Sequence, residues 1–444
     1  MSFESTALSF PEFRQRWSFL ICAIVVAAGL GYSVAFGHWA YVLVLAGLPL
    51  LLCWPIPTAI GVFALMVPFD SVSAIGDSGI TLTHIVAGVS GAVLLICGLL
   101  TGRMEKPPRA AWWWTGLILW ALTTSVWAFD PAPALQRIPT AVSLLCFYLV
   151  AVSCRLRRDE LLWVSIAVIL GGFLAAGFVT VQFMQGNFSS AERSSLTVSG
   201  IEMDPNQFAA AQLLPISLGM GLFLSLKGWT TRLFSLGVVA GMSFAVLISM
   251  SRGALVALIV MALYYCVRMR AGLRVLAIVG IFCLLLLAVP SLFFQRLTLA
   301  ASTGGAGRLD IWHVGTLLAA KYGIFGTGLD NFPVRYQQYS GMAPTFHGYF
   351  RGPHNIFLGL IVETGIPGAI LFGGAVWSSL TAGWRKLVRS NLLPQLVAYE
   401  AGCLSLLVAG FFLDVMWRKT FWLGWLLLAL AARARSETAE VKVV

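Results

Sequence analysis

The chain has 444 residues, of which 59% are hydrophobic and only 11% are charged, and its mean hydropathy is +0.87. Soluble domains do not have this composition, which repeatedly gives apolar runs of about twenty residues, the length that spans a bilayer. The net charge of +11 comes from basic residues in twos and threes between the apolar runs, not from one surface stripe, so a nucleic-acid partner is not expected.

The apolar runs predict transmembrane helices. They lack the two-residue alternation of barrel strands, and a lone span must satisfy its backbone hydrogen bonds internally. The predicted fold class is therefore all-α, a polytopic transmembrane helical bundle of about 12 to 14 spans with a long periplasmic loop containing short helices. The predicted spans cover residues 17–36, 38–53, 57–70, 82–101, 110–128, 134–153, 160–184, 206–226, 231–249, 252–268, 272–293, 354–382, 395–414 and 419–433.

The distribution of basic residues predicts the orientation of the bundle. Nineteen of the 29 Lys and Arg residues fall in alternate connections, which the positive-inside rule assigns to the cytoplasm together with both termini. Tryptophans at span ends are expected to form an interfacial aromatic belt: Trp112, Trp113, Trp114, Trp417, Trp422 and Trp425.

Two long connections, 185–205 and 294–353, fall on the opposite side, where long loops are usually functional or disordered. Within the second, Leu309, Trp312, Leu317 and Leu318 recur at helical spacing, which predicts an amphipathic helix at the outer interface.

Arginines on this side are candidate anion ligands. Ser251-Arg252-Gly253 forms a tight turn that places Arg252 in the first turn of a helix, where a cation opposes the helix dipole and favours a bound anion. A guanidinium that reaches lipid headgroups is an equally good interpretation. Arg193 can be an ordinary loop cation, and Arg308 can pair with Asp310. Arg137 is a weaker candidate.

Two further residues stand at predicted helix starts. Asp204 precedes Pro205 and is expected mainly to cap the next span. His354 opens an apolar run, and there both the helix dipole and partial burial favour the neutral imidazole that a general base requires. Capping or anchoring at the interface is the alternative role for His354.

No metal or cofactor is expected. The acidic residues form no DxD or other carboxylate cluster, and the short cytoplasmic connections hold no glycine-rich phosphate loop. The eight cysteines form no CxxC motif.

Five short motifs in order carry a resemblance to a known family. They are Arg193 leading into Asp204-Pro205-Asn206, Ser251-Arg252-Gly253-Ala254-Leu255, Gly307-Arg308-Leu309-Asp310-Ile311-Trp312, Gly326-Thr327-Gly328-Leu329-Asp330-Asn331-Phe332, and His354-Asn355-Ile356-Phe357 followed by Glu363-Thr364-Gly365. This order resembles the bacterial O-antigen ligase superfamily, which also holds O-antigen polymerases and protein O-oligosaccharyltransferases. The division expected from it is N-terminal transmembrane helices at 1–184, a ligase-like core at 185–375 with the periplasmic loop 294–353, and C-terminal helices with a cytoplasmic tail at 376–444.

The resemblance implies an O-antigen ligase of the bacterial inner membrane. Such an enzyme is a metal-independent, inverting glycosyltransferase that moves a glycan from undecaprenyl pyrophosphate to lipid A-core at the periplasmic face. On the matching positions, Arg193 and Arg252 would bind the pyrophosphate, and Arg308 would assist in pyrophosphate binding or act on the acceptor. His354 would deprotonate the acceptor hydroxyl. An O-antigen polymerase that uses a lipid-linked repeat as acceptor, and a polytopic lipid-glycan transporter, are the alternatives.

Overall fold

The computed structural model describes residue 51 and residues 53–75, 80–186, 193–269, 307–345, 348–384 and 393–440. The predicted spans at 17–36 and 272–293, and all of 38–53 except residues 51 and 53, lie outside these residues. The elements are α3 (Pro55–Met66), η1 (Val67–Val72), α4 (Leu82–Leu100), α5 (Arg109–Thr124), η2 (Ser125–Trp127), α6 (Pro131–Ser153), α7 (Arg158–Met184), β1 (Thr197–Val198), β2 (Ile201–Glu202), α8 (Pro205–Ser225), α9 (Trp229–Ile248), α10 (Arg252–Met269), α13 (Arg308–Tyr322), α14 (Phe332–Tyr339), η3 (Ser340–Met342), α15 (Ile356–Trp384), α16 (Leu393–Gly410) and α17 (Lys419–Glu440). Strands β1 and β2 pair antiparallel, with Val198 opposite Ile201.

Eight helical segments among the described residues are long and apolar enough to cross a membrane: Pro55–Val72, Leu82–Leu100, Pro131–Ser153, Arg158–Met184, Pro205–Ser225, Trp229–Ile248, Arg252–Met269 and Ile356–Ala382. This confirms the predicted all-α, multi-pass membrane fold. The count of 12 to 14 spans stays a prediction, as do the three-part division of the chain and the location of the termini.

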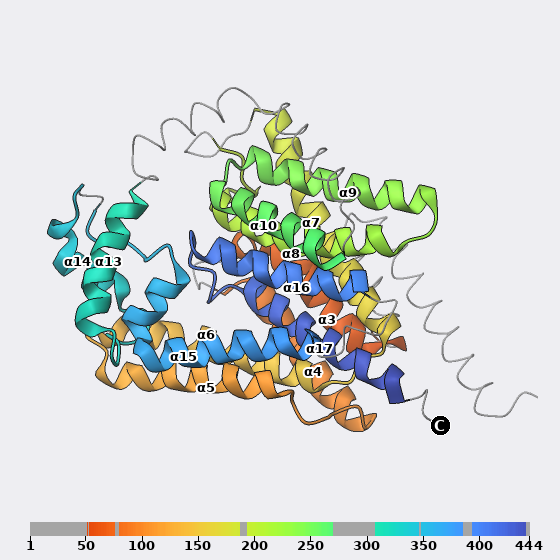
Figure 1. The fold of residues 1–444 in the computed structure, drawn as a ribbon, viewed down its shortest axis with the longest axis horizontal. Helices are drawn as coiled ribbons and strands as arrows, with labels where there is room; N and C mark the ends of the chain where they lie inside the picture. Colours follow the sequence, from red (N-terminus) through yellow and green to blue (C-terminus); the bar gives the residue numbers. More distant parts are fainter. Residues whose placement is uncertain are drawn as a thin grey trace, which may run out of the picture.

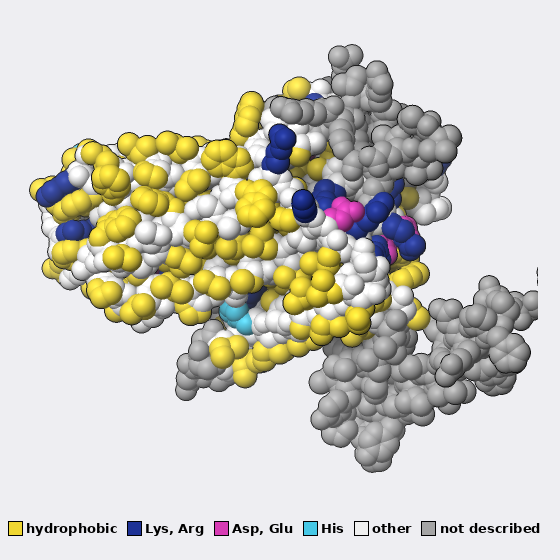
Figure 2. Space-filling model, turned by 90° about the horizontal axis from the view of Figure 1, so that it is seen from below, with side chains coloured by type: hydrophobic (Ala, Val, Ile, Leu, Met, Phe, Trp, Pro, Cys, Tyr) yellow, Lys and Arg dark blue, Asp and Glu magenta, His cyan; other side chains and the backbone are white. Residues whose placement is uncertain are grey.

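The helices pack side by side in a bundle, with α13 and α14 at one end and the C-terminus toward the other (Figure 1). We call the first of these the α13 end. Figure 2 shows a broad hydrophobic face along the bundle, with most visible charged side chains gathered toward its ends. Such a face suits a lipid surrounding.

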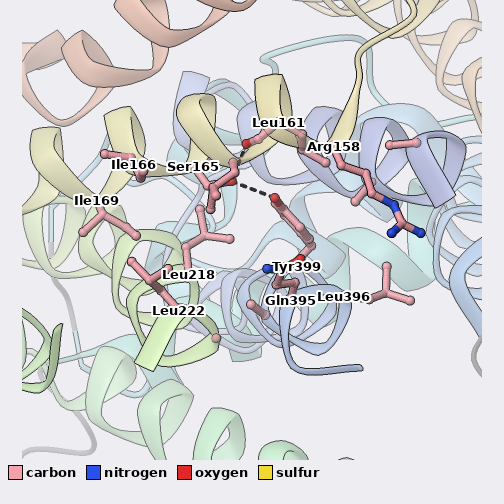
Figure 3. Close-up of a pocket in the computed structure, with 15 residues that line it drawn as sticks. Arg158, Leu161, Ser165, Ile166, Ile169, Leu218, Leu222, Gln395, Leu396 and Tyr399 are labelled. Atoms are coloured by element: carbon pink, nitrogen blue, oxygen red, sulfur yellow. Dashed lines mark hydrogen bonds between the residues drawn. The ribbon is translucent and has the colours of Figure 1, made fainter. Parts of the chain in front are cut away.

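The end opposite α13 is held by ion pairs and close packing. Arg103 pairs with Glu160, and Arg433 with Glu105 at 2.7 Å. A cavity of about 70 Å³ lies nearby between α7, α8, α16 and α17 (Figure 3). The hydroxyl groups of Ser165 and Tyr399 line this cavity and lie 2.7 Å from each other. Because these polar groups satisfy one another, the helices pack here without unpaired hydroxyls.

The predicted aromatic belt is wrong for three of its tryptophans. Trp114 and Trp425 have no exposed surface and Trp422 has 4%, whereas Trp112 is exposed as expected. The Trp114 ring packs against the rings of Trp422 and Trp425 at centroid distances of 5.3 Å and 5.5 Å. These side chains are part of the core formed where α5, α15 and α17 pack together, and such packing buries residues that a single span would expose.

The amphipathic helix predicted within the second long connection is confirmed as α13. The set of residues that it buries differs from the set that the sequence predicts. Ile311, Val314 and Leu318 form the buried stripe and pack with α14 and α15. Leu309 and Leu317 are 58% and 38% exposed. Contact with α14 and α15 therefore decides which face of α13 is buried, and the spacing of its large apolar residues does not.

Candidate active site

Four helices begin close together at the α13 end. Helix α8 starts directly after Asp204, α10 starts at Arg252, α13 starts at Arg308, and α15 starts two residues after His354. The charge of Arg308 interacts with Arg252 and Asp204, and the charge of His354 interacts with Arg308 and Asp204. Helix N-termini carry partial positive charge and unpaired N–H groups. The structure thus brings three of the four predicted site residues into one electropositive cluster.

Arg252 lies in the tight turn predicted from Ser251-Arg252-Gly253. Met250 takes a left-handed conformation (φ 54°), which lets the chain reverse between α9 and α10. A side chain at Gly253 would meet Phe412 at 2.8 Å, so the start of α10 is pressed against the α16–α17 connection. Arg252 is half-buried, and no described residue forms a hydrogen bond or ion pair with its guanidinium.

Arg308 is half-buried at the first position of α13. Burial, and then the nearby positive charge of Arg252, lowers the pKa of the Arg308 guanidinium, while Asp204 opposes that change. Arg308 forms no ion pair with Asp310 in the part of the chain that the structure describes, so the structural alternative for Arg308 is wrong. Two half-buried positive charges therefore lie within electrostatic range of each other, with the exposed Asp204 as a nearby carboxylate, and a bound anion would relieve their repulsion.

His354 does not cap α15. Asn355 does, since its Oδ1 accepts the N–H groups of Phe357 at 3.0 Å and Leu358 at 3.1 Å. His354 itself has a left-handed backbone (φ 45°), an unusual conformation for a residue other than glycine and one enriched at functional sites. The connection before it is fixed by Trp312, whose Nε1–H donates to the Pro353 carbonyl at 3.2 Å.

The surroundings of His354 favour its neutral form. Burial lowers the pKa of the imidazole, and the positive charges of Arg308 and Arg351 lower it further, whereas Asp204 raises it. At pH 7 the ring is then uncharged and has a free lone pair, as a general base requires. The sequence predicts a neutral imidazole at His354 from partial burial and the helix dipole. The structure adds Arg308 and Arg351 as a further cause of the lowered pKa.

The structure confirms the predicted role of Asp204 as a helix cap and shows a second, electrostatic role. Its Oδ1 accepts the N–H groups of Asn206 at 2.8 Å and Gln207 at 3.0 Å, and so caps α8. Its negative charge also acts on Arg308 and His354. Sequence reasoning missed this second role because the chain does not reveal which helix starts meet.

Arg193 lies beside the cluster in a structural contact. Its Nε–H donates to the Ser249 carbonyl at 2.9 Å, and one terminal nitrogen donates to Asn206 Oδ1 at 2.9 Å. These bonds tie the loop before β1 to the α9–α10 turn and to the first turn of α8. Arg193 thus supports the turn that presents Arg252, three residues beyond Ser249.

The last two motifs shape α15. Gly365 has φ 70° and breaks the helix, and the segment 323–328 fills the break: Ile366 N–H donates to the Gly323 carbonyl, and Thr327 N–H to the Val362 carbonyl, both at 2.8 Å. At Gly326 an added side chain would lie 2.2 Å from the Glu363 carbonyl, so only glycine fits. These contacts fix the part of α15 that begins beside His354.

Arg137 is engaged elsewhere. Its guanidinium donates twice to Asp330, from Nε and from one terminal nitrogen, each at 3.1 Å. Asp330 belongs to the same glycine-rich motif, and this pair links α6 to the loop inserted into α15. Arg137 therefore serves the scaffold, and the motif at 326–332 is structural.

Residues 237–373 match the O-antigen ligase family. This confirms the resemblance predicted from the motifs, over a minority of the chain that contains Arg252, Arg308 and His354. Arg193 and Asp204 lie before the matched segment. No curated protein matches the chain. The family consists of glycosyltransferase-like enzymes, ligases and polymerases, that act on lipid-linked glycans.

Proposed function

We propose that this protein is an O-antigen ligase that transfers a glycan from undecaprenyl pyrophosphate to lipid A-core at the periplasmic face of the bacterial inner membrane. The observation that carries the proposal is the cluster at the α13 end, where the half-buried Arg308 interacts electrostatically with Arg252 and with His354, whose surroundings favour its neutral form. The family match over residues 237–373 supports the same class of reaction.

The arginines supply the pyrophosphate site. A planar guanidinium binds phosphate oxygens through two parallel N–H donors, and adjacent helix N-termini add unpaired backbone N–H groups. Arg252 and Arg308 are placed to do this directly because α10 and α13 begin with them. Arg193 supports the site by holding the turn before Arg252, and we assign it to pyrophosphate binding only together with that turn.

His354 acts as the general base in this proposal. Its imidazole takes the proton of the acceptor hydroxyl as the hydroxyl oxygen attacks C1 of the donor sugar. The bond between C1 and the phosphate oxygen breaks, and the electron pair leaves with undecaprenyl pyrophosphate, whose charge the arginines stabilise. Attack opposite the leaving group inverts C1. Guanidinium groups neutralise the departing diphosphate in this scheme, so no metal or other cofactor is invoked.

Reconstitution tests the proposal. The purified protein in vesicles receives an undecaprenyl-pyrophosphate glycan and lipid A-core, without added metal or nucleotide, and the lipid A-core band is followed on a gel. A shift of that band to higher mass supports ligation. Growth of the lipid-linked glycan itself would instead identify a polymerase. Movement of the intact donor across the bilayer without any new glycosidic bond would identify a transporter and overturn the proposal.

A further inference from the structure

A second cavity lies between α3, α4, α6 and α17 and is lined by none of the candidate site residues. Its volume is about 400 Å³ and its wall is mostly apolar, with Phe147, Trp422 and Leu426 among the lining side chains. Along α4 the lining runs from His84 to Leu95, a length of roughly 16 Å at 1.5 Å per residue. The cavity is therefore long enough for an extended hydrocarbon chain parallel to the helices.

The charges at the His84 end of this cavity are already compensated. Lys419 lines the cavity, and its Nζ donates to Asp70 Oδ1 at 2.6 Å, to Thr83 Oγ1 at 2.8 Å and to Thr81 Oγ1 at 3.3 Å. An ammonium group has three donors, and all three are used. Among the described residues that line this cavity, a phosphate or diphosphate would therefore find no free lysine or arginine.

His84 offers one neutral donor instead. The Thr81 N–H donates to His84 Nδ1 at 3.2 Å, and the Thr81 hydroxyl lies 2.8 Å from the same nitrogen. With Nδ1 as the acceptor of these bonds, a neutral ring has its proton on Nε2. His84 lines the cavity, and no described residue accepts the Nε2–H. The ring stands in the first turn of α4, at the depth where a spanning helix meets the polar part of a bilayer.

We propose that this cavity binds one acyl chain of a membrane glycerolipid, with the ester carbonyl of that chain accepting a hydrogen bond from His84 Nε2–H. The apolar length fits the chain, the single uncharged donor fits the carbonyl, and the saturated Lys419 disfavours a diphosphate at the same place. The bound lipid holds α4 in the bundle. Only 22% of α4 is buried, the smallest share of any candidate span in the described chain, so this helix gains most from an added partner.

Two glycines of α4 allow a direct test. An added side chain would meet nothing within 4 Å at Gly88, and only Phe147 at 3.8 Å at Gly91, because both positions face the cavity. Gly88→Leu therefore places a bulky side chain in the cavity, and its Cβ meets no protein atom within 4 Å. Gly373→Leu in α15 is the matched control, since its added side chain also meets nothing within 4 Å but lies outside the cavity lining.

The experiment uses a phosphatidylethanolamine with a photoreactive diazirine in one acyl chain, added to vesicles that hold the full-length protein. Peptide mapping after illumination should find adducts on α4, α6 and α17 of the wild type and of Gly373→Leu, and their loss in Gly88→Leu. Gly91→Leu gives a second cavity-filling variant should Gly88→Leu fail to fold. Adducts that persist in the cavity-filled variants, or that avoid these helices, overturn the proposal. Stronger labelling of the same peptides by a photoreactive undecaprenyl phosphate would also overturn it.

Discussion

Two groups of buried charges lie at the α13 end and differ in how their charge is compensated. Lys419 has its counter-charge, Asp70, at 2.6 Å, and threonine hydroxyls take up its remaining donors. Arg308 has Asp204 in electrostatic range, and neither Arg308 nor Arg252 forms an ion pair within the described chain. A buried charge without a partner is costly unless something binds it. The first group therefore stabilises the fold, whereas the second is suited to receive an anion. Four experiments test this distinction.

Replacing His354 should have the largest effect on activity. Loss of a general base typically costs about 10²- to 10⁴-fold in rate, and His354→Ala should therefore reduce glycan transfer by that order. Because Asn355 and not His354 caps α15, thermal stability should change little. Transfer rates and melting temperatures are measured together, with His313→Ala on the exposed side of α13 as the matched control. A His354→Ala enzyme with full activity would end its assignment as the base.

Removing Lys419 should act on stability instead. Breaking a buried ion pair by deleting one partner costs about 3–5 kcal/mol, so Lys419→Met should lower the melting temperature strongly while the folded fraction keeps its transfer rate. Asp70→Asn together with Lys419→Met removes both charges and should recover part of the loss. Thermal unfolding in detergent tests this. A loss of transfer without a loss of stability would mean that this pair belongs to the chemistry and that the distinction drawn above is wrong.

Local sequence patterns predict the helices well. A lone apolar run of about twenty residues that crosses a bilayer must be helical, because its backbone groups can bond only to one another. Short motifs predict three local features correctly: the start of α10 at Arg252, the cap at Asp204 and the helix α13. The burial of Trp114 was not, because it depends on which span packs beside α5.

The site was predictable as a set of residues but not as an arrangement. Arg252, Arg308 and His354 were singled out by their places at helix starts and by the order of motifs. Their convergence depends on contacts across long stretches of chain, such as the Ile366–Gly323 bond at the break in α15. For the same reason the sequence does not show that Arg137 binds Asp330, which is 193 residues away, and so leaves Arg137 as a weak candidate anion ligand.

Arg252 and Arg137 give the next contrast, between an arginine that has no ion pair among the described residues and one that pairs with Asp330. A hydrogen bond to a charged group contributes about 1.5–3 kcal/mol, so Arg252→Ala should reduce transfer at low donor concentration by roughly 10- to 100-fold. Arg252→Lys should recover little of this, because an ammonium lacks the planar pair of donors. Steady-state rates at varied donor concentration measure the effect.

Arg137→Ala is the control for that measurement. It breaks the pair with Asp330 that links α6 to the loop in α15, so it should lower thermal stability and leave the donor concentration for half-maximal rate unchanged. Equal effects of the two alanine variants on donor use would show that pairing does not separate binding arginines from structural ones.

The smallest effect is expected from Asp204, and it tests the electrostatics of the cluster by sign. Because the pKa of His354 is lowered, transfer should hold constant below the imidazole's usual pKa of 6.5 and decline only at more acidic pH. Asp204→Asn keeps a good helix cap but removes the carboxylate that raises this pKa, so the acidic decline should move to still lower pH. Arg308→Lys keeps the positive charge and should leave it nearly in place, whereas Arg308→Met removes a charge that lowers the pKa and should move it to higher pH. Rates from pH 4.5 to 8 measure all three variants against the wild type. Shifts of the same sign for Asp204→Asn and Arg308→Met would mean that neither charge acts on the base.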